Sequence, residues 1–398
     1  MDFDELFDTS ADDEQEENSF HKANIARMRE EKERQARQRA MIKKLLPVAA
    51  AGLLVVILII TGLVFGIKKI VNGIKDKRAQ AAAEEQVVET QYDEYVFPTP
   101  IIEETPKHIY TGMVEIKVPQ PEMVEGYEMD ASSPNKAISE EDVQSQFATL
   151  INASTGKVLV SRNAFDRMNP ASMTKVMTVL VACENITDLN QACEIMIEDT
   201  DFAYLNDLSI AGFEEGEIVP LKDILYGAIM PSGGECCHAL ERIVAGDEET
   251  FIKMMNDKAK ELGLKNTHYT NSAGLYNDNH YTTPVDMAMV MKAAIENELC
   301  RQVLYEHIYM TAKTEQHPEG LELSNWFQRR IEDKYTTTEV MGAKTGYVYQ
   351  SGNCAVSYTI DENGEVYICV TGNAHSAWRA IFDHVALYNM YITDKKSQ

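Results

Sequence analysis

After residue 67, three segments of the chain place a lysine three residues after a serine, a spacing that could build an activated nucleophile. On a helix, residues three apart lie on one face, with Cβ atoms about 5–6 Å apart. A serine hydroxyl becomes a good nucleophile when a neighbouring base takes its proton. A lysine can be that base when burial or a second cation makes its neutral form accessible.

Context selects the third segment, with Ser172 and Lys175. The first, residues 133–136, contains a proline and is not helical. The second, residues 154–157, contains a glycine and lies in a turn between two apolar runs. Only Ser172 follows a proline suited to a first helical position and precedes apolar residues at helical spacing.

The surrounding pattern predicts the elements that must position this pair. Strands are expected at both ends of the domain, over residues 147–151, 158–160, 340–347, 353–360 and 366–370. Apolar periodicity predicts helices from Pro170 and over residues 221–230, 235–244, 251–262, 284–297 and 378–391. This order predicts an α+β fold, with one antiparallel sheet flanked by helices and an inserted helical lobe. A site is expected in the cleft between sheet and lobe.

The front of the chain predicts a membrane anchor. Residues 1–44 begin with nine carboxylates before Lys22 and then turn basic, as expected of a disordered cytoplasmic tail. Residues 45–67 carry no charge and exceed the about 20 residues that a spanning helix needs. A cleaved signal peptide would start near residue 1 and have a shorter apolar segment. We therefore expect an uncleaved signal-anchor, with the amino terminus cytoplasmic and the domain extracytoplasmic.

Residues 68–142 are expected to form an extracytoplasmic stalk, because prolines punctuate a stretch with little periodicity. A small β-module around residues 107–123 is the alternative. The catalytic domain is expected over residues 143–398.

Composition excludes several other classes. The net charge of -26 argues against a nucleic-acid partner. No Cys/His spacing matches a zinc site, and the adjacent pair Cys236 and Cys237, followed by His238, is a poor chelator. The sequence thus predicts neither a metal nor a cofactor.

Three motifs, taken together, carry a resemblance. Residues 172–175 (Ser-Met-Thr-Lys), 232–234 (Ser-Gly-Gly) and 344–346 (Lys-Thr-Gly) come in the order of the signature motifs of penicillin-binding proteins and serine β-lactamases. Alone, the second would be read as a turn between helices and the third as an ordinary strand end. With the flanking residues 271–275 (Asn-Ser-Ala-Gly-Leu), the region 145–395 resembles the low-molecular-mass D-alanyl-D-alanine carboxypeptidases.

The resemblance implies a β-lactamase/transpeptidase-like fold and an acyl-enzyme mechanism. Ser172 would be the nucleophile, Lys175 the general base and Ser232 the proton relay to the leaving amine. The protein would be a serine D-Ala-D-Ala carboxypeptidase. It would remove the terminal D-alanine of peptidoglycan stem peptides, with β-lactams as covalent inhibitors.

The third motif and its neighbours would bind the substrate. Lys344 and Thr345 would hold the terminal carboxylate, and Gly346 would allow close approach to the strand. Backbone N–H groups of Ser172 and Tyr347 would form an oxyanion hole. Arg379 would be a second contact to the carboxylate.

One position departs from the family pattern. The second motif usually ends in asparagine, and here that place is Gly234. Either Glu235 or water fills the gap, or activity is reduced. Two alternatives therefore stay open: a β-lactamase of the same fold, and a non-catalytic protein that binds peptidoglycan.

Overall fold

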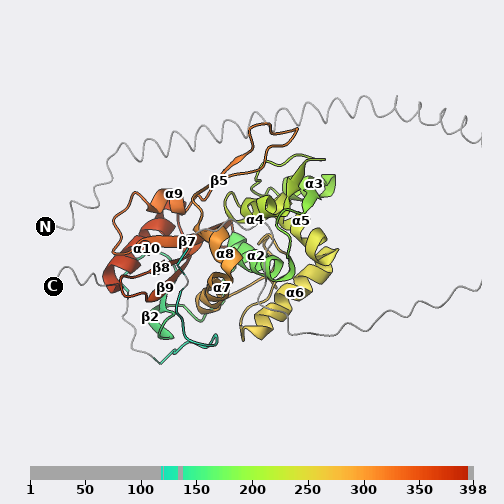
Figure 1. The fold of residues 1–398 in the computed structure, drawn as a ribbon. Helices are drawn as coiled ribbons and strands as arrows, with labels where there is room; N and C mark the ends of the chain where they lie inside the picture. The colour runs from blue at the N-terminus through green and yellow to red at the C-terminus, as the bar shows by residue number, and fades with distance from the viewer. Residues whose placement is uncertain (1–117, 120, 133–137, 393–398) are drawn as a thin grey trace, which may run out of the picture. The chain divides into compact units, whose positions relative to one another are not determined.

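The computed structural model describes residues 118–119, 121–132 and 138–392 (Figure 1). The expected tail, the expected signal-anchor and most of the expected stalk lie outside this range. Within it, no helix combines the length and apolar character needed to cross a bilayer.

A five-stranded antiparallel sheet forms one side of the domain. Its strands are β1 (Phe147–Asn152), β2 (Lys157–Arg162), β7 (Val340–Val348), β8 (Gly352–Ile360) and β9 (Val366–Ala374). They lie in the order β2-β1-β9-β8-β7, so strands from both ends of the domain pair, as the sequence predicts. This order leaves β7, which carries the Lys-Thr-Gly motif, at an edge of the sheet.

Helices cover both faces of the sheet (Figure 1). One face packs against α10 (Ala377–Tyr391), with α9 (Gln328–Ile331) in the same buried cluster. The other packs against α7 (Pro284–Glu296), which is followed by α8 (Glu298–Tyr305). Two separate groups of buried apolar residues form the cores of these faces.

The larger core continues into a helical lobe. The lobe contains β3 (Ala192–Glu194), α3 (Ile197–Leu205), β4 (Ile218–Pro220), α4 (Leu221–Ile229), α5 (Gly234–Ala245) and α6 (Glu248–Glu261). At its centre, the short helix η2 (Ala171–Met173) leads into α2 (Thr174–Asn185), which contacts α4, α5, α6, α7 and α8. Because α2 is surrounded, its first ten residues are all buried.

The α+β fold, with its antiparallel sheet and helical lobe, agrees with the prediction, and so do its main strands and helices. The sequence did not predict α3, α8, α9 or the β5 (Ile308–Met310) and β6 (Glu322–Ser324) hairpin. The segment of α3 has no apolar residue between Ile197 and Phe202, so its sequence shows no apolar stripe at helical spacing. In the structure, Ile197, Tyr204 and Leu205 are all exposed. The N-terminus of α3 is held instead by Asp199, which accepts from the backbone N–H of Met196 at 2.8 Å.

Part of the expected stalk packs onto the domain. Val124 donates its backbone N–H to the carbonyl of Ala153 at 3.1 Å, and Asp130 donates to that of Gly156 at 2.8 Å. These carbonyls belong to the β1–β2 turn. Residues 121–132 of the expected stalk therefore lie against the domain, and the stalk over residues 68–142 stays a prediction. The alternative β-module at 107–123 lies almost wholly outside the described residues.

Candidate active site

Ser172 lies in η2, immediately before the buried helix α2. Ala171, the preceding residue, has a φ of 44°, which residues other than glycine rarely adopt. The Oδ1 atom of Asn169 accepts from the backbone N–H of Ala171 at 2.9 Å. We call residues 169–173 the Ser172 turn. Strained backbone held by its neighbours is typical of functional sites, and here it fixes the direction of Ser172.

Lys175 lies one helical turn further along and faces Ser172. Its Nζ atom is 3.0 Å from the Oγ atom of Ser172 and donates to the carbonyl of Ala273 at 2.8 Å. The side chain is fully buried. Burial lowers the pKa of Lys175, because desolvation disfavours the ammonium form. The pair thus has the geometry of a hydroxyl beside a candidate base.

The carbonyl that Lys175 contacts belongs to a tight loop, residues 271–275. The Oδ1 atom of Asn271 accepts from the N–H groups of Gly274 and Leu275 at 2.7 and 2.9 Å. Gly274 has a φ of 87°, and a Cβ atom there would lie 1.9 Å from the carbonyl oxygen of Ala171. Only glycine fits this contact between the loop and the Ser172 turn. No role was predicted for Ala273, although the Asn-Ser-Ala-Gly-Leu motif predicted the importance of its segment.

The edge strand β7 brings the third motif to the same place. A Cβ atom on Gly346 would lie 2.9 Å from the backbone nitrogen of Ser172, so the strand touches the Ser172 turn. Lys344 is buried, and its Nζ atom donates to the carbonyl of Thr345 at 2.9 Å. Burial is the larger cause, and together with the positive charge of Lys175 it lowers the pKa of Lys344 to about 7. Two lysines therefore share one poorly solvated region.

Ser232 lies in the turn between α4 and α5, in the helical lobe. Its φ of 67° is left-handed, and its Oγ atom is buried without a hydrogen-bond partner among the described residues. The thiol of Cys237 donates to the carbonyl of Gly233 at 3.4 Å. The first turn of α5 thus packs against the second motif. A buried hydroxyl without a partner is suited to bond a substrate.

The remaining predicted residues differ in their placement. Tyr347 follows Gly346 on the edge strand, and its side chain is 61% exposed. Arg379 lies on α10, where its Nε atom bonds Asp383 at 2.8 Å and its guanidinium bonds the carbonyl of Asp142 at 3.0 Å. None of these contacts involves the cluster, so the structure does not bring Arg379 to it.

Gly234, the departure from the family pattern, is the first residue of α5. Its backbone N–H donates to the carbonyl of Ser209 at 2.7 Å. A Cβ atom at this position would lie 2.7 Å from one side-chain carbon of Leu208 and 3.3 Å from the Cβ of Ala203. A side chain at 234 would therefore collide with packed apolar groups.

His280 is a residue that sequence reasoning missed. It is buried, and its Nε2 atom is 2.8 Å from the Oγ1 atom of Thr174. The backbone N–H of Thr270 donates to Nδ1 at 3.1 Å, so the ring proton is on Nε2, and Thr174 accepts it. Burial lowers the pKa of His280 to about 4, which keeps the ring neutral. It thus ties the start of α2 to the segment before the 271–275 loop.

Together these groups can perform acyl transfer. They provide a hydroxyl, a buried amine within hydrogen-bond distance and a second cation for an anionic substrate group. Over the described part of the chain, no cluster of three His, Cys, Asp or Glu side chains could hold a metal ion.

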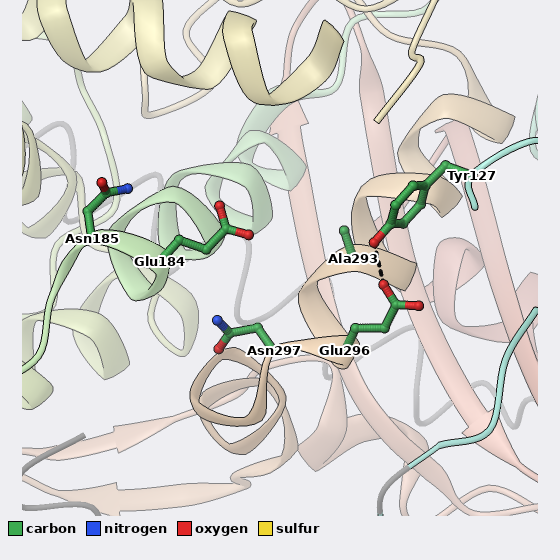
Figure 2. Close-up of a pocket in the computed structure, with 6 residues that line it drawn as sticks. All are labelled: Tyr127, Glu184, Asn185, Ala293, Glu296 and Asn297. Atoms are coloured by element: carbon green, nitrogen blue, oxygen red, sulfur yellow. Dashed lines mark hydrogen bonds between the residues drawn. The ribbon is translucent and has the colours of Figure 1, made fainter. Parts of the chain in front are cut away.

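Two cavities lie near α2. The one in Figure 2, of about 410 Å³, lies at the carboxyl end of the helix, around Glu184 and Asn185. Both of its carboxylates have cationic partners, Glu184 with Lys258 at 2.7 Å and Glu296 with Lys292 at 2.6 Å. The cavity is therefore remote from Ser172, and the charges of its two carboxylates are balanced by these lysines.

The second cavity, also of about 410 Å³, adjoins the Ser172 turn. It is lined by Asn169 and by residues of two loops, including Tyr276 and Gln350. Its polar lining and its place beside Ser172 make it suitable for part of a peptide substrate.

Comparison with known proteins gives a consistent result. A family described as D-alanyl-D-alanine carboxypeptidase, Peptidase_S11, matches residues 134–375. The D-alanyl-D-alanine carboxypeptidase DacF of Bacillus subtilis is 37% identical over 168 residues, which are 42% of this chain and 43% of that protein. The DacD enzyme of Escherichia coli is 29% identical over 231 residues, 56% of this chain and 57% of that protein. The matches thus span less than two thirds of these relatives.

A solved structure has the same architecture. The crystal structure of the Streptomyces K15 DD-transpeptidase aligns with a TM-score of 0.57 and 26% sequence identity. The alignment covers 63% of this chain and 98% of that one.

Proposed function

Because the chain belongs to the D-alanyl-D-alanine carboxypeptidase family, we propose that it is a serine hydrolase that removes the terminal D-alanine from peptidoglycan stem peptides. The observation that carries the proposal is the 3.0 Å contact between the Oγ atom of Ser172 and the Nζ atom of Lys175. The close approach of β7 to the same turn supports it.

In the proposed acylation, Ser172 attacks the carbonyl carbon of the penultimate D-alanine. Neutral Lys175 takes the hydroxyl proton as the new C–O bond forms. Burial favours this role because it lowers the pKa of the lysine. The backbone N–H groups of Ser172 and Tyr347 stabilise the oxyanion, and the missing side chain of Gly346 lets β7 approach the Ser172 turn closely.

The leaving group is the amine of the terminal D-alanine. In the proposal, the unpartnered hydroxyl of Ser232 passes a proton from Lys175 to this amine as the C–N bond breaks. Lys344 and Thr345 bind the terminal carboxylate, and the cavity beside Asn169 holds upstream residues of the stem peptide. Water then hydrolyses the acyl-enzyme and regenerates Ser172.

We also propose that residues 45–67 anchor the protein in the cell membrane, with the domain outside. The support is the charge-free run in the sequence, long enough to span a bilayer. The full chain should sediment with membranes, and a variant that lacks residues 1–67 should not. Recovery of the full chain in the soluble fraction would contradict the anchor.

The catalytic proposal is tested with a fluorescent penicillin and a synthetic peptide ending in D-Ala-D-Ala. The full chain should be labelled covalently and should release D-alanine, and the Ser172→Ala variant should do neither. Labelling that persists in Ser172→Ala would exclude Ser172 as the nucleophile.

Gly234 favours one second candidate, a protein of this fold that binds peptidoglycan without hydrolysing it. It predicts binding without release of D-alanine, so the same peptide assay separates the two candidates.

A further inference from the structure

The second residue of α5, Glu235, buries a carboxylate beside the proposed site. Its side chain is 1% exposed. The Oε1 atom accepts from the backbone N–H of Ala211 at 2.6 Å and from that of Gly212 at 3.0 Å. The Oε2 atom is buried and has no hydrogen-bond partner in the described part of the chain. A buried carboxylate oxygen without a partner is costly, so its presence calls for an explanation.

The position of Oε2 links this carboxylate to the second motif. A Cβ atom on Gly233 would lie 3.0 Å from Oε2 and 3.1 Å from the backbone nitrogen of Ala211. The carboxylate therefore lies between the residue that follows Ser232 and the segment 209–212. That segment also accepts the backbone N–H of Gly234, through the carbonyl of Ser209 at 2.7 Å. Glu235 thus ties the segment 209–212 to residues 230–233, which carry Ser232 and which we call the Ser232 turn.

The charge of Glu235 also acts on Lys175. Besides Lys175, the groups in this region are Lys344 of β7 and Cys236, Cys237 and Glu235 of α5. Burial raises the pKa of Cys237 to about 12 and that of Cys236 well above its usual range, so both thiols are neutral at pH 7. Burial also raises the pKa of Glu235, while hydrogen bonds from Gly212 and Ala211 and the charge of Lys175 lower it. In its ionised form, Glu235 is the anion of this set. Its carboxylate raises the pKa of Lys175 against the larger, opposite effect of burial.

A polar side chain at position 234 could not replace Glu235 without rearrangement. The nearest carbons of Leu208 lie 2.7 and 2.8 Å from the place of a Cβ atom at Gly234. The helix instead presents a carboxylate one residue later, and this residue is anchored by two backbone N–H groups.

We propose that Glu235 is a positioning residue of this enzyme. At the start of α5 it supplies the polar side chain that the family's asparagine provides and that Gly234 lacks. Its carboxylate fixes the segment 209–212 against the Ser232 turn and keeps Lys175 from losing its proton too readily. This inference rests on the proposed function, since it concerns the same Ser172 and Lys175.

The test is the pH dependence of acylation of the full chain by a fluorescent penicillin. In Glu235→Gln, the amide oxygen can still accept both backbone N–H groups, but the negative charge is lost. The pKa of Lys175 should fall, so the acid limb of the pH profile should move down by about one pH unit, as expected for a lost opposite charge at close range. A purely structural role would lower the rate equally at every pH.

Two further variants complete the test. Glu235→Asp keeps the charge on a shorter side chain, so its acid limb should stay at the wild-type pH while the plateau rate falls. Glu217→Gln is the matched control, because Glu217 is equally buried but bonds Thr314 at 2.7 Å and His317 at 2.9 Å outside the site. Its profile should coincide with that of the wild type.

An acid limb that does not move in Glu235→Gln, or that moves equally in Glu217→Gln, would overturn the inference. If Glu235→Gln does not fold, a shifted acid limb in Glu235→Asp would overturn it as well. Failure of the proposed function looks different, because the wild-type chain would then show no labelling that depends on Ser172.

Discussion

Substitution of Gly274 by alanine should inactivate the protein through a backbone collision. The new Cβ atom would lie 1.9 Å from the carbonyl oxygen of Ala171, 2.3 Å from its carbonyl carbon and 2.8 Å from the nitrogen of Ser172. These are backbone atoms and cannot rotate away. The loop 271–275 or the Ser172 turn must therefore move.

The size of the movement follows from ordinary contact distances. Restoring a separation of about 3.5 Å from the oxygen of Ala171 requires a shift of roughly 1.5 Å. The loop carries the carbonyl of Ala273 that holds Lys175, and the turn carries Ser172. A misplacement of about 1 Å can cost about 10²-fold in rate, so acylation should fall at least about 100-fold.

Gly246 offers a matched control. Its φ of 88° is almost equal to the 87° of Gly274, but no atom lies within 4 Å of the place of its Cβ. Both alanine substitutions carry the same left-handed backbone cost, about 1–2 kcal/mol, and the same effect on the unfolded chain. The difference between the two variants therefore isolates the collision.

The assay is the rate of labelling by a fluorescent penicillin, together with the free energy of unfolding from urea titration. Gly246→Ala should acylate within about threefold of the wild type, since α5 ends there, away from Ser172. Gly274→Ala should also lose a further 1–3 kcal/mol or so of stability. If Gly274→Ala acylates as fast as Gly246→Ala, the argued contact between loop and turn is wrong.

Three further substitutions test other parts of the structure. The pKa of Lys344 is lowered to about 7 in the fold, so between about pH 7 and 10 the unfolded chain binds more protons and stability rises with pH. Lys344→Met should remove this rise, seen as a flatter melting temperature against pH, while it abolishes labelling; an unchanged slope would contradict the lowered pKa. His280→Leu leaves the Thr174 hydroxyl and the N–H of Thr270 without their partner, so it should cost about 1–3 kcal/mol in urea unfolding and slow acylation. Tyr127→Phe removes the bond to Glu296 seen in Figure 2, and it should leave the acylation rate unchanged, because that pocket is at the far end of α2; a loss of labelling would contradict this separation.

The sequence predicted the parts of the site that depend on local order. The spacing of Ser172 and Lys175 on a helix after Pro170 is a local property, and the structure has the pair in contact. Alternating and apolar runs likewise predicted the strands of the sheet and several helices. The Lys-Thr-Gly motif was correctly placed on a strand.

Only the tertiary structure decided which distant groups complete the site. The carbonyl of Ala273 reaches Lys175 across 98 residues, and His280 reaches Thr174 across 106. Neither hydrogen bond can be predicted from a periodic pattern in the sequence, because each depends on how residues 271–280 pack against α2 in the folded chain. Arg379 is the opposite case, a predicted site residue that the fold keeps away from the site. Its guanidinium forms an ion pair with Asp383, one helical turn further along α10.

Residue types and spacing therefore determined that the protein carries a hydroxyl, two amines and a strand with the Lys-Thr-Gly motif. Packing decided the environment of these groups. It determined which lysines are buried away from water, which hydroxyl has no hydrogen-bond partner and which carboxylate is buried next to the second motif. These properties follow from burial, and burial is set jointly by sheet, lobe and loops rather than by any one segment.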